Sequence, residues 1–396
     1  MLTAFVGFAL GRHHSIVLKQ DGSVWSTGRE QNSEHQLGDK YDFAWSRIGN
    51  GMSVAAGNYH SLVLKLDGSV WAAGQNMYGQ LGDGSMHDQS EFVEVISDGA
   101  LALAGGDQYS MVVKRDGTVW AAGRNHHGQL GDGSKQDRRS FAMVIAGDVK
   151  AVTTGGSHTL VIKGDGTVWS TGCNSHGQLG TGGTVKEKLR FSKVKFSKAV
   201  KGGVEQVAAG CWHSFVVRRD GSVWGSGRNV FGQLGDGSEM AKKVFTPVVT
   251  GGAIAVAAGH SHSMLLKRDG SVWTTGSNVH GQLGDGSCTD RKKFIRVIRR
   301  GIRAMAAGYA HSMVLARDGT LWATGWNLFG QFGDGTIYST SNFTAVAKLT
   351  DDVVRDAVTV ATQNILTSKL PVAKRFPGRF PGRFPTTGES VMLAAR

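Results

Sequence analysis

Short apolar segments of strand length, separated by turn signals, recur along most of the chain. In the unit that begins at residue 253, AIAVAAG and HSMLLK are two such segments, and Asp269-Gly270 is a hairpin signal because glycine readily adopts the positive φ of tight turns. SVWTTG follows, then the loop GSNVHGQLGDGS, and then the apolar segment FIRVI. This order predicts four short antiparallel strands per unit, as in one blade of a β-propeller.

The motif D-G-[ST]-[VL]-W marks seven copies of this unit. The copies begin at Asp21, Asp67, Asp116, Asp165, Asp220, Asp269 and Asp318. Helical repeats are the competing interpretation, and they fit poorly because each unit is rich in Val, Thr, Trp and Gly. We therefore predict an all-β fold, a seven-bladed β-propeller of four-stranded antiparallel blades. Its repeated Trp is expected to pack between neighbouring blades, because one Trp buries a large apolar area.

The repeat units end at about residue 350, and the rest of the chain departs from them. Residues 351–370 resemble a faded start of another unit and could supply a strand that closes the ring, so the propeller is placed at 1–370. Residues 371–396 contain KRFPGRFPGRFP, which predicts a disordered basic tail. That tail has either no function or a supporting role in binding a partner.

Composition excludes several classes of function. The chain has 58 Gly, 5 Pro and 3 Cys among 396 residues, so neither a disulfide framework nor a CxxC metal site is expected. No phosphate loop, nucleophile–base pair or membrane-length apolar segment stands out from the repeat. We predict a monomeric, non-enzymatic protein of the cytoplasm or nucleus, without cofactor or metal. The net charge of +13 favours an anionic partner.

Seven copies of one glycine-rich loop are more typical of a structural device than of a catalytic site. The loop reads G-x-N-x-x-G-Q-L-G-D-G-S in its best copies. Glycine permits tight folding, and the Asn and Gln side chains can satisfy backbone groups that the loop leaves unpaired. We interpret Asn and Gln as internal hydrogen-bonding residues of each blade.

Positive charge recurs at one place in four consecutive units, directly after G-D-G-S. This basic arc comprises Lys135, Arg138 and Arg139, then Lys186, Lys188 and Arg190, then Lys242 and Lys243, and finally Arg291, Lys292 and Lys293. Equivalent repeat positions lie at equivalent places on a propeller, so the arc is expected along one rim. It is either an ordinary solvated surface or a site for a polyanion whose binding weakens with salt.

A second basic set precedes the Asp-Gly turns in six units. It comprises Lys19, Lys65, Lys114, Lys163, Arg218 and Lys267. Because the set is nearly universal, we interpret it as solvated hairpin ends that protect strand edges.

Together, A-A-G-x-x-H-S, D-G-x-V-W and G-x-N-x-x-G-Q-L-G-D-G resemble the regulator of chromosome condensation repeat. The resemblance covers residues 1 to about 350 and implies a seven-bladed propeller. Family members include an exchange factor for the small GTPase Ran, a plant UV-B photoreceptor and modules of ubiquitin ligases, so the fold does not decide the function. The photoreceptor needs several Trp residues in its G-x-x-H loops, and this chain has one there, Trp212.

In the exchange factor, the face that carries the G-x-x-H loops engages the GTPase. By resemblance, a partner-binding face would here include His60, Asp107, Trp212, His213, His262 and His311. For the repeated histidines we prefer a structural role, in which half-buried rings satisfy backbone groups of the loops. No insertion resembles the wedge of the exchange factor.

We therefore expect a protein-interaction platform that binds a partner through one propeller face or through the basic arc. An exchange factor for a Ran-like small GTPase is the first alternative. A chromatin or nucleic-acid binder is the second. An acidic protein partner would suit the positive net charge of the chain.

Overall fold

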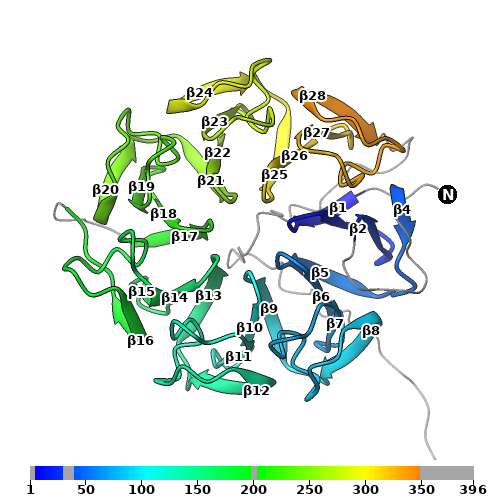
Figure 1. The fold of residues 1–396 in the computed structure, drawn as a ribbon, viewed down its shortest axis with the longest axis vertical. Coiled ribbons are helices and arrows are strands. Elements are labelled where there is room, and N and C mark those ends of the chain that lie inside the picture. The colour runs from blue at the N-terminus through cyan, green and yellow to red at the C-terminus, as the bar shows by residue number, and fades with distance from the viewer. Residues whose placement is uncertain (1–4, 30–39, 198–202, 348–396) are drawn as a thin grey trace, which may run out of the picture.

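The computed structural model describes residues 5–29, 40–197 and 203–347 as a ring of seven four-stranded antiparallel sheets (Figure 1). Each sheet consists of four strands that are consecutive in the chain, so each sequence unit forms one blade. The predicted seven-bladed all-β propeller is confirmed.

The strands fall into four classes by their place in the blade. Blades 1 to 7 comprise β1–β4, β5–β8, β9–β12, β13–β16, β17–β20, β21–β24 and β25–β28. The innermost strands are β1 (Phe5–Leu10), β5 (Gly51–Ala56), β9 (Ala100–Gly105), β13 (Val149–Thr154), β17 (Val204–Ala209), β21 (Ala253–Ala258) and β25 (Ile302–Ala307). The second strands are β2 (His14–Lys19), β6 (His60–Lys65), β10 (Tyr109–Lys114), β14 (His158–Lys163), β18 (His213–Arg218), β22 (His262–Lys267) and β26 (His311–Ala316).

The third strands are β3 (Val24–Gly28), β7 (Val70–Gly74), β11 (Val119–Gly123), β15 (Val168–Cys173), β19 (Val223–Gly227), β23 (Val272–Gly276) and β27 (Leu321–Gly325). The outermost strands are β4 (Lys40–Trp45), β8 (Gln89–Ile96), β12 (Arg138–Ile145), β16 (Glu187–Lys193), β20 (Lys242–Val249), β24 (Arg291–Ile298) and β28 (Thr340–Ala347). These outer strands form the rim of the ring in Figure 1.

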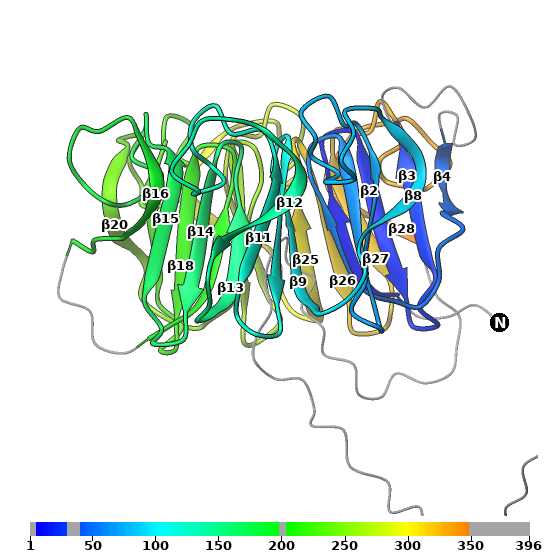
Figure 2. The ribbon, with the colours of Figure 1, turned by 90° about the horizontal axis from the view of Figure 1, so that it is seen from below.

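The strands run between two opposite faces of the ring, where the turns gather (Figure 2). Connections between first and second strands and between third and fourth strands share one side, which we call the loop face. The Asp-Gly hairpins and the linkers between blades share the other side, which we call the hairpin face. The G-x-x-H loops and the G-D-G-S loops therefore lie on the same face.

The fourth strand begins earlier than the apolar pattern predicts. In blade 6 we expected it to begin at Phe294, but β24 begins at Arg291, which pairs with Gly276 across a register shift. An outermost strand has one edge and one face open to solvent, so charged residues are tolerated in it. Apolar periodicity alone therefore missed the first three residues.

Apolar cores lie between neighbouring blades, and each contains one repeated Trp. Between blades 6 and 7, for example, Leu266 and Val272 are buried with Met305 and Val314, and Trp322 packs against them. The other repeated Trp residues take the same place in the remaining six cores. The predicted role of the Trp is confirmed.

Direct packing of blade 7 against blade 1 closes the described ring. The Thr27 hydroxyl donates to the Gly330 carbonyl at 2.7 Å, and Ser15 and His311 are hydrogen-bonded at 3.2 Å. Residues 5–10 form the innermost strand of blade 1. The segment predicted to close the ring, 351–370, and the predicted tail at 371–396 lie outside the described residues.

Within the described part of the chain, no helix is long and apolar enough to cross a membrane.

Candidate interaction surfaces

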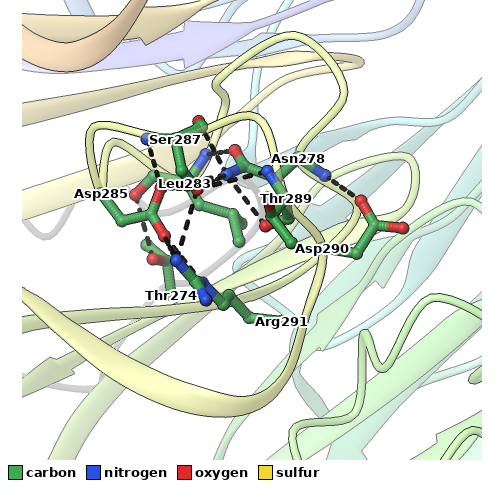
Figure 3. A network of polar contacts seen from close by, with 8 residues as sticks. All are labelled: Thr274, Asn278, Leu283, Asp285, Ser287, Thr289, Asp290 and Arg291. Atoms are coloured by element: carbon green, nitrogen blue, oxygen red, sulfur yellow. Dashed lines mark hydrogen bonds and ion pairs between the residues drawn. The ribbon is translucent and has the colours of Figure 1, made fainter.

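In blades 2 to 7, one Asn holds the glycine-rich loop, as Figure 3 shows for Asn278. The Asn278 amide group donates to the Asp285 carboxylate at 3.0 Å and to the carbonyls of Ser287 and Thr289 at 3.0 and 3.1 Å. Its side-chain oxygen accepts from the backbone N–H of Leu283 at 2.9 Å. A buried amide with this many partners stabilises a long loop that has little regular structure.

The Gln of the same loop also bonds within its own blade. The side-chain oxygen of Gln282 accepts from the backbone N–H of His280 at 2.9 Å. The equivalent bond recurs in the other described copies, for example from Phe231 to Gln233 at 3.0 Å. The interpretation of Asn and Gln as internal residues is confirmed, so these loops present no binding site through them.

The repeated histidines form a belt that links successive blades around the ring. The His213 Nε2 atom lies 2.9 Å from the Ser263 hydroxyl of the next blade, and that hydroxyl donates to the Gln233 carbonyl at 2.7 Å. The same His–Ser pair joins each of the other blades that carry the histidine. Its further members are His14–Ser61, His60–Ser110, His158–Ser214, His262–Ser312 and His311–Ser15.

This geometry determines how the histidines titrate. Because the Ser263 hydroxyl donates to a carbonyl, it accepts the proton on His213 Nε2, which leaves Nδ1 as the unprotonated nitrogen. That Nδ1 is buried and has no hydrogen-bond partner among the described residues. Burial, with smaller contributions from neighbouring histidines, lowers the pKa of His213 to about 3, since a second proton would add an unsolvated charge.

Four of the histidines predicted for a binding face are therefore unavailable at the surface of this structure. His60, His213, His262 and His311 are each exposed by 1% or less. The structural interpretation also needs correction, because the rings are fully buried and bond to a serine of the next blade rather than to loop backbone. In blade 3, Tyr109 replaces the histidine and donates to the His158 carbonyl at 2.5 Å.

The two remaining predicted face residues are half-buried on the loop face. Trp212 packs edge-on against His176, with ring centres 5.7 Å apart. Asp107 accepts a hydrogen bond from the Asn58 amide, and burial raises the pKa of its carboxyl. Both side chains therefore lie where a partner could contact them.

Around these two residues lies a layer of aromatic and arginine side chains that sequence reasoning missed. Near the propeller axis, the Arg12 guanidinium carbon lies 4.6 Å from the Tyr309 ring centre and 5.6 Å from that of Tyr59. Trp326 stacks on His280 with ring centres 5.5 Å apart. Aromatic–arginine pairs of this kind are common in energetically important parts of protein interfaces.

The layer extends outward through the G-x-N loops. The Arg124 guanidinium lies over Tyr78 at 5.1 Å, and that of Arg228 lies over Phe231 at 5.5 Å. The residue after the loop Asn is apolar and exposed in four blades: Met77 by 47%, Val230 by 48%, Val279 by 62% and Leu328 by 56%. We call this set, with the aromatic–arginine layer, the loop-face surface.

A signal for this surface was present in the sequence. The two positions after the loop Asn vary between copies while their neighbours are constant, and an apolar residue at an exposed loop position has no structural purpose of its own.

Nine of the eleven residues of the basic arc lie on the outer strands of four consecutive blades, β12, β16, β20 and β24 (Figure 1), and Lys135 and Lys186 lie in the loops before β12 and β16. Arg138, Lys188, Lys242 and Arg291 each pair with the last Gly of the third strand of their blade. This shared register places the four residues at equivalent positions, as the repeat alignment predicted. Their binding role stays a prediction.

Part of the arc is used within the protein. Arg138, Lys242 and Arg291 pair with the Asp of their own G-D-G loop, and the Arg291 Nη2 atom lies 2.6 Å from the Asp285 carboxylate. Lys135 pairs with Glu187, and Lys292 pairs with Glu239 at 2.9 Å. The other arc residues make no ion pair with a described residue: Arg139, Lys186, Lys188, Arg190, Lys243 and Lys293.

Five residues of the second basic set have a role beyond the one predicted. Lys19, Lys65, Lys114, Lys163 and Lys267 each place Nζ over the repeated Trp of their own blade, at distances from 3.6 to 5.0 Å. The lysine and the Trp point to the same side of the blade, so the ammonium group covers the ring. The set thus forms cation–π pairs in addition to ending the hairpins.

Among the described residues, no group of three or more His, Cys, Asp or Glu side chains is arranged to hold a metal ion.

Comparisons with known proteins agree with this architecture. Residues 138–366 match the RCC1-like domain, and 53–80, 101–129 and 67–113 match the regulator of chromosome condensation (RCC1) repeat. No curated protein sequence matches significantly. Human WBSCR16 superposes with a TM-score of 0.70 at 24% identity, over 79% of this chain and 87% of that one.

Two yeast structures show the same fold. Yeast RCC1 (Prp20) bound to Kap60 has a TM-score of 0.72 at 19% identity, over 86% of this chain and 85% of that one. Prp20p from Saccharomyces cerevisiae has a TM-score of 0.73 at 20% identity, over 84% and 88%. The RCC1-like domain match covers more than half of the residues, and the repeats fold into the seven expected blades. The chain therefore belongs to the RCC1-like domain family.

Proposed function

We propose that this propeller is a non-catalytic protein-interaction platform and that its loop-face surface binds the partner. One observation carries the proposal. Aromatic and arginine side chains gather on one face, surrounded by exposed Met77, Val230, Val279 and Leu328. Exposed apolar residues that recur at one loop position are characteristic of an interaction site.

The charge of this surface favours a partner with acidic groups. Arg12, Arg124 and Arg228 belong to it, and the nearby Arg29 guanidinium lies 5.5 Å from the Phe329 ring centre. Asp107 is the one carboxylate of the G-x-x-H loops. The aromatic rings supply apolar contact area, and the guanidinium groups supply hydrogen bonds and charge at the same place. A protein whose surface combines apolar and carboxylate side chains fits both properties.

The relatives supply two specific candidates. Prp20p is described with binding to Gsp1p and histones, and yeast RCC1 with Kap60. At 19 to 20% identity these structures support the fold, and a shared partner is a hypothesis for this chain. An exchange factor for a small GTPase remains an alternative that uses the same loop face.

A substitution on the loop face tests the proposal against a matched control. Leu328→Asp places a charge in the loop-face surface, and Leu66→Asp places the same charge at a similarly exposed position, 64% against 56%, on the hairpin face. We expect affinity capture from native lysate, followed by mass spectrometry, to recover a partner with the unmodified protein and with Leu66→Asp. Recovery with Leu328→Asp should fall at least tenfold.

Equal recovery with both variants would contradict the loop-face proposal. If a small GTPase is recovered, its nucleotide release should be measured with and without the propeller. Accelerated release would support the exchange-factor alternative.

The basic arc supports a second candidate, binding of chromatin or nucleic acid. Arg139, Lys243 and Lys293 are exposed on three outer strands without ion pairs to described residues. A Lys243→Glu, Lys293→Glu variant in the same capture experiment should lose salt-sensitive nucleic-acid partners and keep loop-face partners. Loss of every partner in this variant would favour the arc over the loop face.

A further inference from the structure

The repeated Trp residues are covered in different ways around the ring. In blades 1, 2, 3, 4 and 6, a lysine at the end of the second strand covers the Trp ring. In blade 5, Phe196 packs edge-on against Trp224 with ring centres 5.5 Å apart, and Trp224 is 6% exposed. In each of these six blades, another side chain therefore lies against the Trp ring.

Blade 7 departs from this rule. The residue at the lysine position is Ala316, which pairs with Ile302 at the end of the second strand, as Lys267 pairs with Ala253 in blade 6. An alanine methyl group is too short to reach across the ring. Trp322 is half-buried, and no cation or aromatic ring among the described residues stacks on it.

A groove of about 620 Å³ lies at this place, between blades 6 and 7. Its apolar lining includes Val297, Ile298, Ala316, Trp322 and Phe343, from the outer strands β24 and β28 and from β26 and β27. A volume of this size accommodates an aromatic side chain with its neighbouring residues. The missing lysine side chain thus coincides with a groove whose lining contains the Trp that it would have covered.

The edge of the groove is strongly basic. Arg299, Arg300 and Arg317 line it with a single carboxylate, Asp318, and the three arginines are exposed and make no ion pair with a described residue. The corresponding linker residues are Ser97-Asp98 between blades 2 and 3 and Thr250-Gly251 between blades 5 and 6. The arginine pair and the missing lysine therefore occur together at this one junction.

We propose that the groove beside Trp322 is a second binding site, which takes a linear protein segment with an aromatic side chain next to carboxylates. The aromatic ring fits the apolar lining against Trp322, and the carboxylates fit the guanidinium groups of Arg299, Arg300 and Arg317. A cationic segment, which would otherwise suit a bare Trp face, is disfavoured by these three charges. The site lies outside the loop-face surface, so it does not depend on the function proposed above.

Ala316→Lys is the sharpest test, because it restores the residue that five blades use. The probe is a fluorescently labelled peptide of sequence Asp-Glu-Phe-Asp-Glu, titrated into the full chain and followed by fluorescence anisotropy. We expect the substitution to weaken binding at least tenfold. Added positive charge would strengthen nonspecific attraction to an acidic peptide, so weaker binding reports occlusion of the groove.

Lys267→Ala is the matched control. It removes the lysine from Trp273 in blade 6, where the Arg296 guanidinium still lies 6.0 Å from the ring centre and the neighbouring linker has no arginine. This variant should bind the peptide no better than the unmodified protein. A peptide with Ser in place of Phe should lose affinity for the unmodified protein, and Arg299→Ala with Arg300→Ala should weaken binding of the original peptide.

Three results would overturn the inference. The first is absence of peptide binding to the unmodified protein, and the second is equal peptide binding by Ala316→Lys. The third is Ala316→Lys-sensitive binding of a ten-nucleotide single-stranded DNA with no binding of the peptide, which would assign the groove to nucleic acid. None of these results would bear on the capture of a partner by the loop face, which Leu328→Asp tests separately.

Discussion

The histidine belt and the loop-face surface are adjacent in sequence and opposite in character. His213 is fully buried and joins blade 5 to blade 6, whereas its neighbour Trp212 is half-buried on the loop face. His60 and Tyr59 show the same contrast. The histidine, which recurs in nearly every unit, serves the contact between blades. The residue before it changes from unit to unit and is half-buried on the loop face in blades 2, 3 and 5.

This difference shows how a repeat should be interpreted. Every blade must fit its neighbour in the same way, so residues at the contacts between blades are constrained in every copy. A partner contacts the assembled ring from outside and meets each copy in a different environment. Departures from the repeat, such as Trp326, Leu328 and Ala316, are therefore more informative about binding than its constant residues.

The largest expected difference between the two regions is their response to acid. Burial lowers the pKa of His60, His158, His213, His262 and His311 to about 3, and that of His14 to about 4. In the unfolded chain, histidine takes up a proton near pH 6.5, so the unfolded state binds more protons between these values. The free energy of unfolding therefore has its full value above pH 6.5 and falls as the pH drops toward 3.

Each histidine contributes about 1.4 kcal/mol per pH unit in this window, so six of them give a slope on the order of 8 kcal/mol per pH unit. Urea unfolding at pH 7.5, 6.0 and 5.0 measures this slope. His262→Gln removes one titrating histidine and should reduce the slope by about 1.4 kcal/mol per pH unit. Carboxylates with lowered pKa, such as Asp132, affect stability only at lower pH, near and below 3.8. Unchanged stability down to pH 4.5 would show that the histidines of the belt are not buried in the neutral form.

A pair of neighbouring substitutions gives the next largest effect. His213→Ala removes a buried ring and its bond to Ser263, and should lower the free energy of unfolding by roughly 2–4 kcal/mol. Trp212→Ala should lower it by at most about 1 kcal/mol and should weaken partner capture instead. Urea unfolding and lysate capture on both variants measure the two effects. If Trp212→Ala destabilises the protein as strongly as His213→Ala, the separation of the two regions is wrong.

The smallest expected effect on the free energy of unfolding comes from the lysine that lies over the repeated Trp. Lys267→Ala removes a cation–π pair and should cost about 0.5–1 kcal/mol, and Ala316→Lys should add a similar amount. Thermal unfolding in low and high salt compares the two variants. If Ala316→Lys destabilises the protein, the position in blade 7 is not equivalent to the lysine positions of the other blades.

Much of the architecture was predictable because each unit repeats a local pattern. The hairpin at Asp269-Gly270, the two strands around it and the packing role of Trp273 all follow from residues close together in the chain. The start of β24 at Arg291 did not follow, because charged residues on an outermost strand carry no apolar signal. The exposed surfaces were the least predictable, since accessibility depends on how blades meet.

By itself, the sequence determined the number of blades, their four strands, the turn chemistry and the internal role of the loop Asn and Gln. These features depend on local hydrogen bonds and on side-chain periodicity within about fifty residues. Only the tertiary structure decided which polar residues are available: it buried His213 against Ser263 and paired Lys135 with Glu187 of the next blade. It also left Trp322 beside Ala316 at the edge of a groove. Burial and pairing depend on residues in the next blade or the next loop, and local sequence does not specify those distances.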